Sequence, residues 1–176
     1  MRPRNFGVRV HNQEKATQGF TLFSPLWDQK TSLINMAGDV VHEWELPGTP
    51  GGYARLLPNG NLFYATTTEE GPPFKGGAGG GLIREVDWDN NVVMEYRDDW
   101  QHHDLRRLPN GNILYAGWEM MPEDAAKRVK GGIPGTELPE GIVNDFVKEV
   151  TPAGEIVWEW HAHSDMDIEK YELHPL

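Results

Sequence analysis

The fold is decided by the stretch Gln101-His102-His103-Asp104-Leu105-Arg106-Arg107-Leu108-Pro109-Asn110-Gly111-Asn112. Its second half, Leu-Pro-Asn-Gly-Asn, also occurs 51 residues earlier, at residues 57–61. An Asn-Gly pair supplies the positive φ of a tight β-hairpin, so each copy predicts a turn between two strands. The first half, His-His-Asp, occurs nowhere else in the sequence. An unrepeated polar cluster on a repeated scaffold is the pattern expected of a functional site on a repeat protein.

A second repeat marks another strand of each unit. The run Asp39-Val40-Val41-His42-Glu43-Trp44 aligns with residues 91–96 and with residues 155–160. Each copy follows a short strand and a tight turn, and β-branched and aromatic runs divided by turns are typical of antiparallel strands. A period of about 50 residues with about four strands per unit is typical of a propeller blade.

We therefore expect an all-β fold, a partial β-propeller made of four-stranded antiparallel blades. Residues 1–17 are expected to form an N-terminal leader, and residues 18–176 the propeller domain. Blade one is expected at about 53–98 and blade two at about 103–162. Residues 19–46 supply three strands of another blade, which gives eleven strands in all. Such an open arc leaves unpaired strand edges, which favour association.

Two insertions interrupt the repeat. The last two Val-Val-type strands are 64 residues apart, twelve more than the first two, and the excess predicts a helical insert at about 121–131. Pro122 near the first turn, early acidic residues, late basic residues and Gly131 as a stop all fit a short helix. The run at residues 76–81 is expected to be a flexible loop, because it lacks the Lys-Ser/Thr of a phosphate-binding loop.

The composition limits the classes of partner. The 176 residues suffice for one domain with a core, and seven Trp, six Phe and five Tyr can fill it. The net charge of −11 repels phosphate backbones, so no nucleic-acid partner is expected. The sequence has no cysteine, which excludes disulfides and thiolate metal sites. No stretch approaches 18 apolar residues, so no membrane partner is expected, and we predict a cytoplasmic protein.

Four stretches together resemble the bacterial arylsulfate sulfotransferase family. They are Gly-Phe-Thr-Leu-Phe-Ser-Pro at 19–25, Val-Val-His-Glu-Trp at 40–44, residues 53–61 and Gln-His-His-Asp at 101–104. The resemblance covers roughly residues 18–176. It implies a six-bladed propeller that moves a sulfuryl group from an aryl sulfate to a phenol through a transiently sulfated histidine in a central funnel. Small aromatic sulfates and phenols are the implied partners, and no cofactor is implied.

The chain is expected to hold about half of that propeller. The nucleophilic histidine of the family, its arginine and one supporting histidine would fall in later blades, so only the His-His-Asp cluster carries over. The resemblance implies that this cluster stabilises the sulfuryl oxygens. Two arcs of three blades could close the propeller as a homo-oligomer. The alternative to a sulfur-group transferase is a non-catalytic fragment that serves as a binding or self-assembling structural module.

Five residues are candidates for the site. His102 and His103 are the catalytic candidates, because imidazole can act as base, nucleophile or charged donor near neutral pH. Alternation along a strand predicts that one ring faces the funnel and the other packs sideways. Substrate binding is assigned to Asp104, Tyr53 and Arg106. The alternatives are a structural hydrogen-bonded histidine cluster, a tyrosine that only fills the funnel and an ordinary ion pair for Arg106.

Another histidine pair lies near the C-terminus. His161 and His163 are two residues apart, and on a strand they would share one face, where they could bind a metal with Asp165. They align with Arg97 and Asp99, at a solvent-side link between blades. We therefore expect no metal ligand among them.

Large aromatic residues recur at one position of each unit. They are Trp44, Tyr96 and Trp160. This recurrence predicts packing between neighbouring blades.

Overall fold

A computed structural model describes residues 8, 10–72, 79–133, 135, 141–170 and 172. The strands are β1 (Thr21–Phe23), β2 (Lys30–Ile34), β3 (Val40–Glu45), β4 (Pro50–Leu56), β5 (Leu62–Thr67), β6 (Gly81–Val86), β7 (Val92–Arg97), β8 (Gln101–Arg107), β9 (Ile113–Met120), β10 (Val143–Val150) and β11 (Ile156–His161). Two short helices are present among these residues, α1 (Glu123–Ala126) and α2 (Ala162–Asp165). Residues 1–7 and 9 of the expected leader, 76–78 of the expected glycine loop, and 134 and 136–140 of the range expected for blade two lie outside the described residues.

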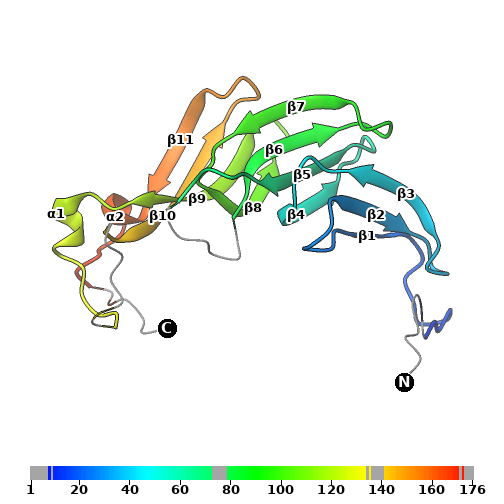
Figure 1. Ribbon diagram of the computed structural model, residues 1–176, viewed down its shortest axis with the longest axis horizontal. Helices are drawn as coiled ribbons and strands as arrows, with labels where there is room; N and C mark the ends of the chain where they lie inside the picture. Colours follow the sequence, from blue (N-terminus) through cyan, green and yellow to red (C-terminus); the bar gives the residue numbers. More distant parts are fainter. Residues whose placement is uncertain are drawn as a thin grey trace.

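The strands form three antiparallel sheets, in the orders β1-β2-β3, β4-β5-β6-β7 and β8-β9-β10-β11. The predicted all-β class and the grouping into three, four and four strands are confirmed. Figure 1 shows the sheets side by side in chain order, with β3, β7 and β11 along the upper rim. The first strands of the two four-stranded sheets, β4 and β8, contact each other, and β1 contacts β4. In the described part of the chain, neither helix is long and apolar enough to cross a membrane.

Two hydrophobic cores lie between neighbouring sheets, and the middle sheet contributes residues to both. Successive residues of a strand point to opposite faces, so Leu62 and Tyr64 pack towards the first sheet while Phe63 and Ala65 pack towards the third. All four are at most 1% exposed. This two-sided burial explains why the first four residues of β5, 62–65, are all apolar or aromatic. Each fully buried large side chain of this kind stabilises the fold by about 1.5–3 kcal/mol.

The recurrent aromatic residues pack between sheets, as predicted, at the two interfaces within the chain. Trp44 is fully buried, and its Nε1 donates a hydrogen bond of 3.0 Å to the backbone oxygen of Asp87, in the turn after β6 of the next sheet. The hydroxyl of Tyr96 lies 3.0 Å from that of Tyr115 on the third sheet. Trp160, at the aligned position of the third sheet, has no further sheet beside it among the described residues.

The hairpins use the repeated Leu-Pro-Asn-Gly-Asn sequence differently from the expectation. Only the glycine takes a positive φ, 87° at Gly60 and 86° at Gly111. Asn59 instead closes its turn with the side chain, whose Oδ1 accepts a hydrogen bond of 3.1 Å from the Asn61 amide. The Asn59 and Asn61 side-chain amides also donate to Glu85 on β6. The repeated asparagines therefore tie the hairpin to the third strand of its own sheet.

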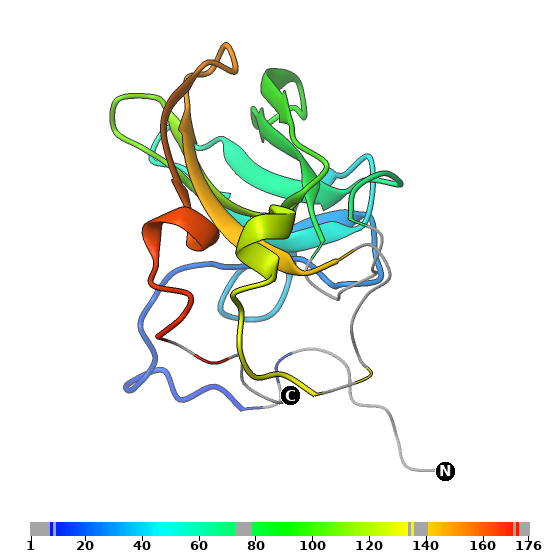
Figure 2. The ribbon, with the colours of Figure 1, turned by 90° about the vertical axis from the view of Figure 1, so that its left-hand side faces the viewer.

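The segment expected to be a helical insert contains α1, which is shorter than predicted. Ala126 and Lys127 donate backbone hydrogen bonds to the carbonyls of Pro122 and Glu123, and the turn ends by Val129. Both α1 and α2 lie at the same end of the third sheet (Figure 2).

Candidate functional site

The histidine pair lies on a bulge at the start of β8. Gln101 pairs with Gly117 and Leu105 with Tyr115, so residues 102–104 oppose a single residue of β9. A bulge bends a strand and re-aims its side chains. The same irregularity occurs in β4 between Pro50 and Ala54. The bulge therefore belongs to the repeat, and the histidines occupy only one copy of it.

The two imidazole rings stack on each other. Their centroids are 4.6 Å apart with 23° between the ring planes, and Nδ1 of His102 lies 2.6 Å from Nδ1 of His103. Regular alternation ends at the bulge, so the two rings lie face to face, and the expectation that one of them faces a funnel stays a prediction. His102 is 5% exposed, whereas His103 is exposed to solvent. Only His103 can meet a ligand directly.

The buried ring is held by two further contacts. Its Nε2 lies 3.1 Å from Oδ1 of Asp145 on β10. Its other face stacks on Trp118 of β9, at 4.4 Å between centroids and 27° between planes. Stacking and the carboxylate together fix the position of His102, and through it the position of His103.

These contacts form a hydrogen-bonded chain from Asp145 through His102 to His103. A contact between two Nδ1 atoms needs one N–H donor and one lone pair. When Nε2–H of a neutral His102 donates to Asp145, its Nδ1 is the acceptor and His103 donates. If Nε2 of His103 then takes up a proton, its ring becomes positively charged. The hydrogen bonds through His102 link this charge to the carboxylate of Asp145. A carboxylate that orients an imidazole and stabilises its cationic form is a recurrent device in proton-transfer sites.

The three residues assigned to substrate binding contact one another beside the histidines, and Arg106 forms the ion pair that was the alternative to its substrate role. Asp104 accepts a hydrogen bond of 2.8 Å from Arg106. The Arg106 guanidinium lies 5.2 Å from the centre of the Tyr53 ring. The Tyr53 hydroxyl is buried and has no hydrogen-bond partner among the described residues. Asp104 thus pairs with Arg106, and the carboxylate that contacts the histidines is Asp145, which sequence reasoning missed.

The glycine aligned with His103 makes room for it. A Cβ at Gly52 would lie 3.2 Å from Cβ of His103, and Gly52 has φ +84°, which L side chains rarely adopt. Gly52 of β4 and His103 of β8 are therefore complementary across the contact between the two strands.

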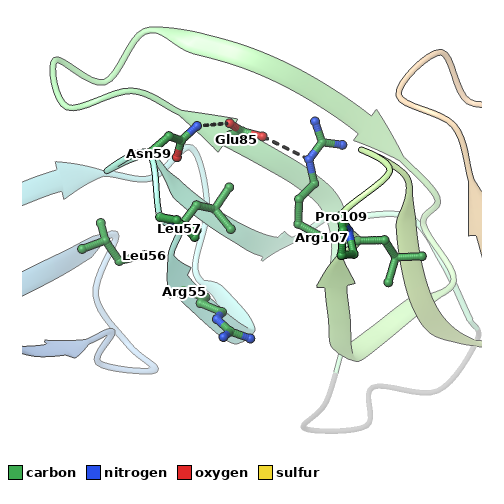
Figure 3. Close-up of a pocket in the computed structure, with 9 residues that line it drawn as sticks. Arg55, Leu56, Leu57, Asn59, Glu85, Arg107 and Pro109 are labelled. Atoms are coloured by element: carbon green, nitrogen blue, oxygen red, sulfur yellow. Dashed lines mark hydrogen bonds and ion pairs between the residues drawn. The ribbon is translucent and has the colours of Figure 1, made fainter.

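A separate pocket of about 690 Å³ lies at the opposite end of β4 and β8, between the two hairpins. Its lining residues are Arg55, Leu56, Leu57, Pro58, Asn59, Glu85, Arg107, Leu108 and Pro109. Figure 3 shows Glu85 between Asn59 and Arg107, with which it forms a hydrogen bond and an ion pair. The pocket does not include the histidine pair.

Comparisons with known proteins bear on the fold. No protein-family model matches the chain, and no curated protein matches it. A crystal structure of a protein of unknown function from Bacteroides caccae is similar, with a TM-score of 0.51 and 16% sequence identity. The match covers 90% of this chain and 50% of the other, so the chain spans about half the length of that protein. At this identity the likeness shows the fold alone.

Proposed function

We propose that the chain is an arc of a β-propeller whose exposed His103, backed by His102 and Asp145, serves in sulfuryl transfer from an aryl sulfate to a phenol. The observation that carries this proposal is the hydrogen-bonded chain Asp145–His102–His103, which ends in an accessible imidazole nitrogen on β8. The reaction class comes from the sequence resemblance. The roles of Asp145, His102 and His103 are inferred from the geometry of the site.

The propeller part of the proposal rests on the arrangement of the sheets. Each four-stranded sheet is a meander in chain order, and the first strands β4 and β8 lie next to each other. First strands that meet while last strands diverge are expected when blades surround a common axis. The histidines would then face that axis.

The site would act by electrostatic stabilisation of the charge that develops during transfer. As the S–O bond of the aryl sulfate breaks and a new S–O bond forms to the acceptor phenol, whose proton passes to the departing phenolate, negative charge develops on the leaving phenolic oxygen and remains spread over the sulfuryl oxygens. A protonated His103 would donate a hydrogen bond to one of these oxygens, and Asp145 would stabilise the cation through His102. Donors already in place where charge develops are among the most effective catalytic groups. Arg106 and the Tyr53 ring beside it would contact the aryl group and its charge.

The test is a transfer assay with 4-nitrophenyl sulfate as donor and phenol as acceptor, following release of 4-nitrophenol. We expect His103→Ala to lower the rate by about 10²–10³-fold, the range for losing one donor at a developing charge. His11→Ala removes an exposed imidazole elsewhere and should leave the rate unchanged. A wild-type rate equal to that of the His102→Ala/His103→Ala double variant would contradict the catalytic role.

The second candidate is a non-catalytic, self-assembling module, favoured by the outer face of the third sheet. This face repeats the residues that the middle sheet buries against the third. The aligned pairs are Phe63 and Leu114, Ala65 and Ala116, Ile83 and Val147, Glu85 and Glu149, Met94 and Trp158, and Tyr96 and Trp160. Phe63, Ala65 and Ile83 are 0% exposed, whereas their counterparts are only half-buried and Trp158 is 49% exposed.

We propose a second copy of the chain as the occupant of this face, since two arcs of three sheets supply six. Both candidate functions share this assembly. A chain that assembles and shows no transfer would favour the module, and transfer that depends on His103 would favour the enzyme.

A further inference from the structure

A second polar cluster lies on the other face of the third sheet, away from the Asp145–His102–His103 chain. It consists of Glu119 at the end of β9, His161 at the end of β11 and His163 in α2. Neighbouring residues of a strand point to opposite faces. Glu119 therefore lies on the face opposite to Trp118, which stacks on His102.

The ligand atoms of the three residues converge. Nδ1 of His161 lies 2.8 Å from Oε1 and 2.9 Å from Oε2 of Glu119, and Nδ1 of His163 lies 3.1 Å from Oε1. One ligand atom from each residue lies within 4.8 Å of the other two. Ligands bound tetrahedrally to Zn²⁺ at 2.0–2.1 Å are about 3.4 Å apart. The two imidazole nitrogens are thus close to this spacing from Oε1 of Glu119, and the three ligand atoms all lie within 4.8 Å of one another, so small side-chain movements would bring them to binding distance of one ion.

Surrounding side chains hold these ligands in place. Asn144, 8% exposed, donates from Nδ2 to Oε1 of Glu119 at 2.9 Å, and its buried Oδ1 has no partner in the described part of the chain. Glu159 lies 3.4 Å from Nε2 of His161. A carboxylate on the far nitrogen of a metal-binding histidine is a common second-shell contact, which orients the ring and raises its basicity.

The cluster is accessible to an ion. The side chains of all three residues are between 21% and 24% exposed, so the cluster is sheltered but open to an ion from solvent.

We propose that Glu119, His161 and His163 bind one divalent transition-metal ion of the Zn²⁺ type. Two imidazoles and one carboxylate suit Zn²⁺ and its neighbours, whereas Mg²⁺ and Ca²⁺ prefer sets of oxygen ligands. Three protein ligands leave a position for water or an anion.

This proposal departs from the sequence-based expectation that none of these residues binds a metal, and its third ligand also differs from the Asp165 considered there. The chain turns into α2 directly after His161, so His161 and His163 do not share a strand. Oδ2 of Asp165 accepts a hydrogen bond from the His161 backbone amide at 2.8 Å. Asp165 thus stabilises the turn from β11 into α2, and Glu119 is the carboxylate beside the two histidines.

Titration calorimetry of the EDTA-treated, dialysed full chain with ZnCl₂ tests the site. We expect one Zn²⁺ per chain, and no comparable binding of MgCl₂. His163→Ala and Glu119→Gln should each weaken Zn²⁺ binding by more than about 100-fold, because even second-shell changes cost about 10–100-fold. His11→Ala, which removes an exposed imidazole, should bind like the wild type.

A second measurement separates binding from folding. Zn²⁺ should raise the melting temperature of the wild type and of His11→Ala, and should not raise that of His163→Ala, which should still unfold cooperatively in EDTA. Absence of stoichiometric Zn²⁺ binding, or wild-type affinity in both ligand variants, would overturn the proposal.

Discussion

Replacing Trp44 with alanine is expected to lower the free energy of unfolding by about 3–5 kcal/mol, the range for deleting a large buried aromatic side chain. Trp44 is 0% exposed and belongs to the core between the first and middle sheets. The variant would open a cavity there and remove the hydrogen bond from Nε1 to the Asp87 carbonyl. Urea unfolding followed by circular dichroism measures the loss as a lower midpoint.

The matched control is Trp160→Ala. Trp160 aligns with Trp44, but it is only half-buried, and no further sheet lies beside it among the described residues. At protein concentrations low enough to keep the chain monomeric, we expect a loss below about 1 kcal/mol, since a half-exposed side chain buries little area. Equal losses for the two variants would contradict the role of Trp44 in joining sheets.

Glu85→Ala is expected to lower the free energy of unfolding by about 2–4 kcal/mol, because the largely buried Arg107 would lose its ionic partner. Glu85 is 4% exposed, lies 3.2 Å from Nε of Arg107 on the third sheet and accepts a hydrogen bond of 2.7 Å from Asn61. The variant removes the acceptor of the Asn61 amide and the ionic partner of the Arg107 guanidinium, which among the described residues keeps only its hydrogen bond to the Gly111 carbonyl. Urea unfolding again measures the change.

Glu149→Ala is the control for this ion pair. Glu149 accepts hydrogen bonds from Asn110 and Asn112, as Glu85 does from the aligned asparagines. Its side chain has no ion pair with a cation among the described residues, so we expect about half the loss seen for Glu85→Ala. A loss for Glu149→Ala as large as that for Glu85→Ala would show that the Arg107 contact adds nothing.

The strands were predictable because their signals are local. Val-Val runs and Leu-Pro-Asn-Gly turns specify extended segments and reversals within a few residues, and their recurrence gave the grouping of eleven strands into three sheets. The contacts between neighbouring sheets could not be predicted in this way, because they join residues that are far apart in the sequence. At the same aligned position, Leu33 and Leu56 share an apolar core between the first two sheets, whereas Glu85 and Arg107 form an ion pair between the next two.

The candidate site was predictable only in its histidines. Asp104 is the carboxylate nearest to the histidines in the sequence, but the contact comes from Asp145, 43 residues after His102. The bulge at residues 102–104 could not be inferred either, because alternation assumes regular pairing with β9. In β10, Asn144 and Asp145 interrupt an otherwise apolar start, which was the one sequence signal available.

The Glu119 cluster was hidden for a similar reason. His161 and Glu119 are 42 residues apart, and the pairing of β9 with β10 and of β10 with β11 brings them together. Residue spacing in the sequence carries no information about such a register.

The central proposal is that a second copy covers the outer face of the third sheet and so completes the surroundings of the histidine pair. The mass of the chain in solution tests this proposal most directly. Sedimentation equilibrium over a range of micromolar concentrations should give twice the chain mass of 19.9 kDa, and Trp160→Ala should shift the equilibrium towards the single chain. A mass of 19.9 kDa at every concentration would contradict the assembly.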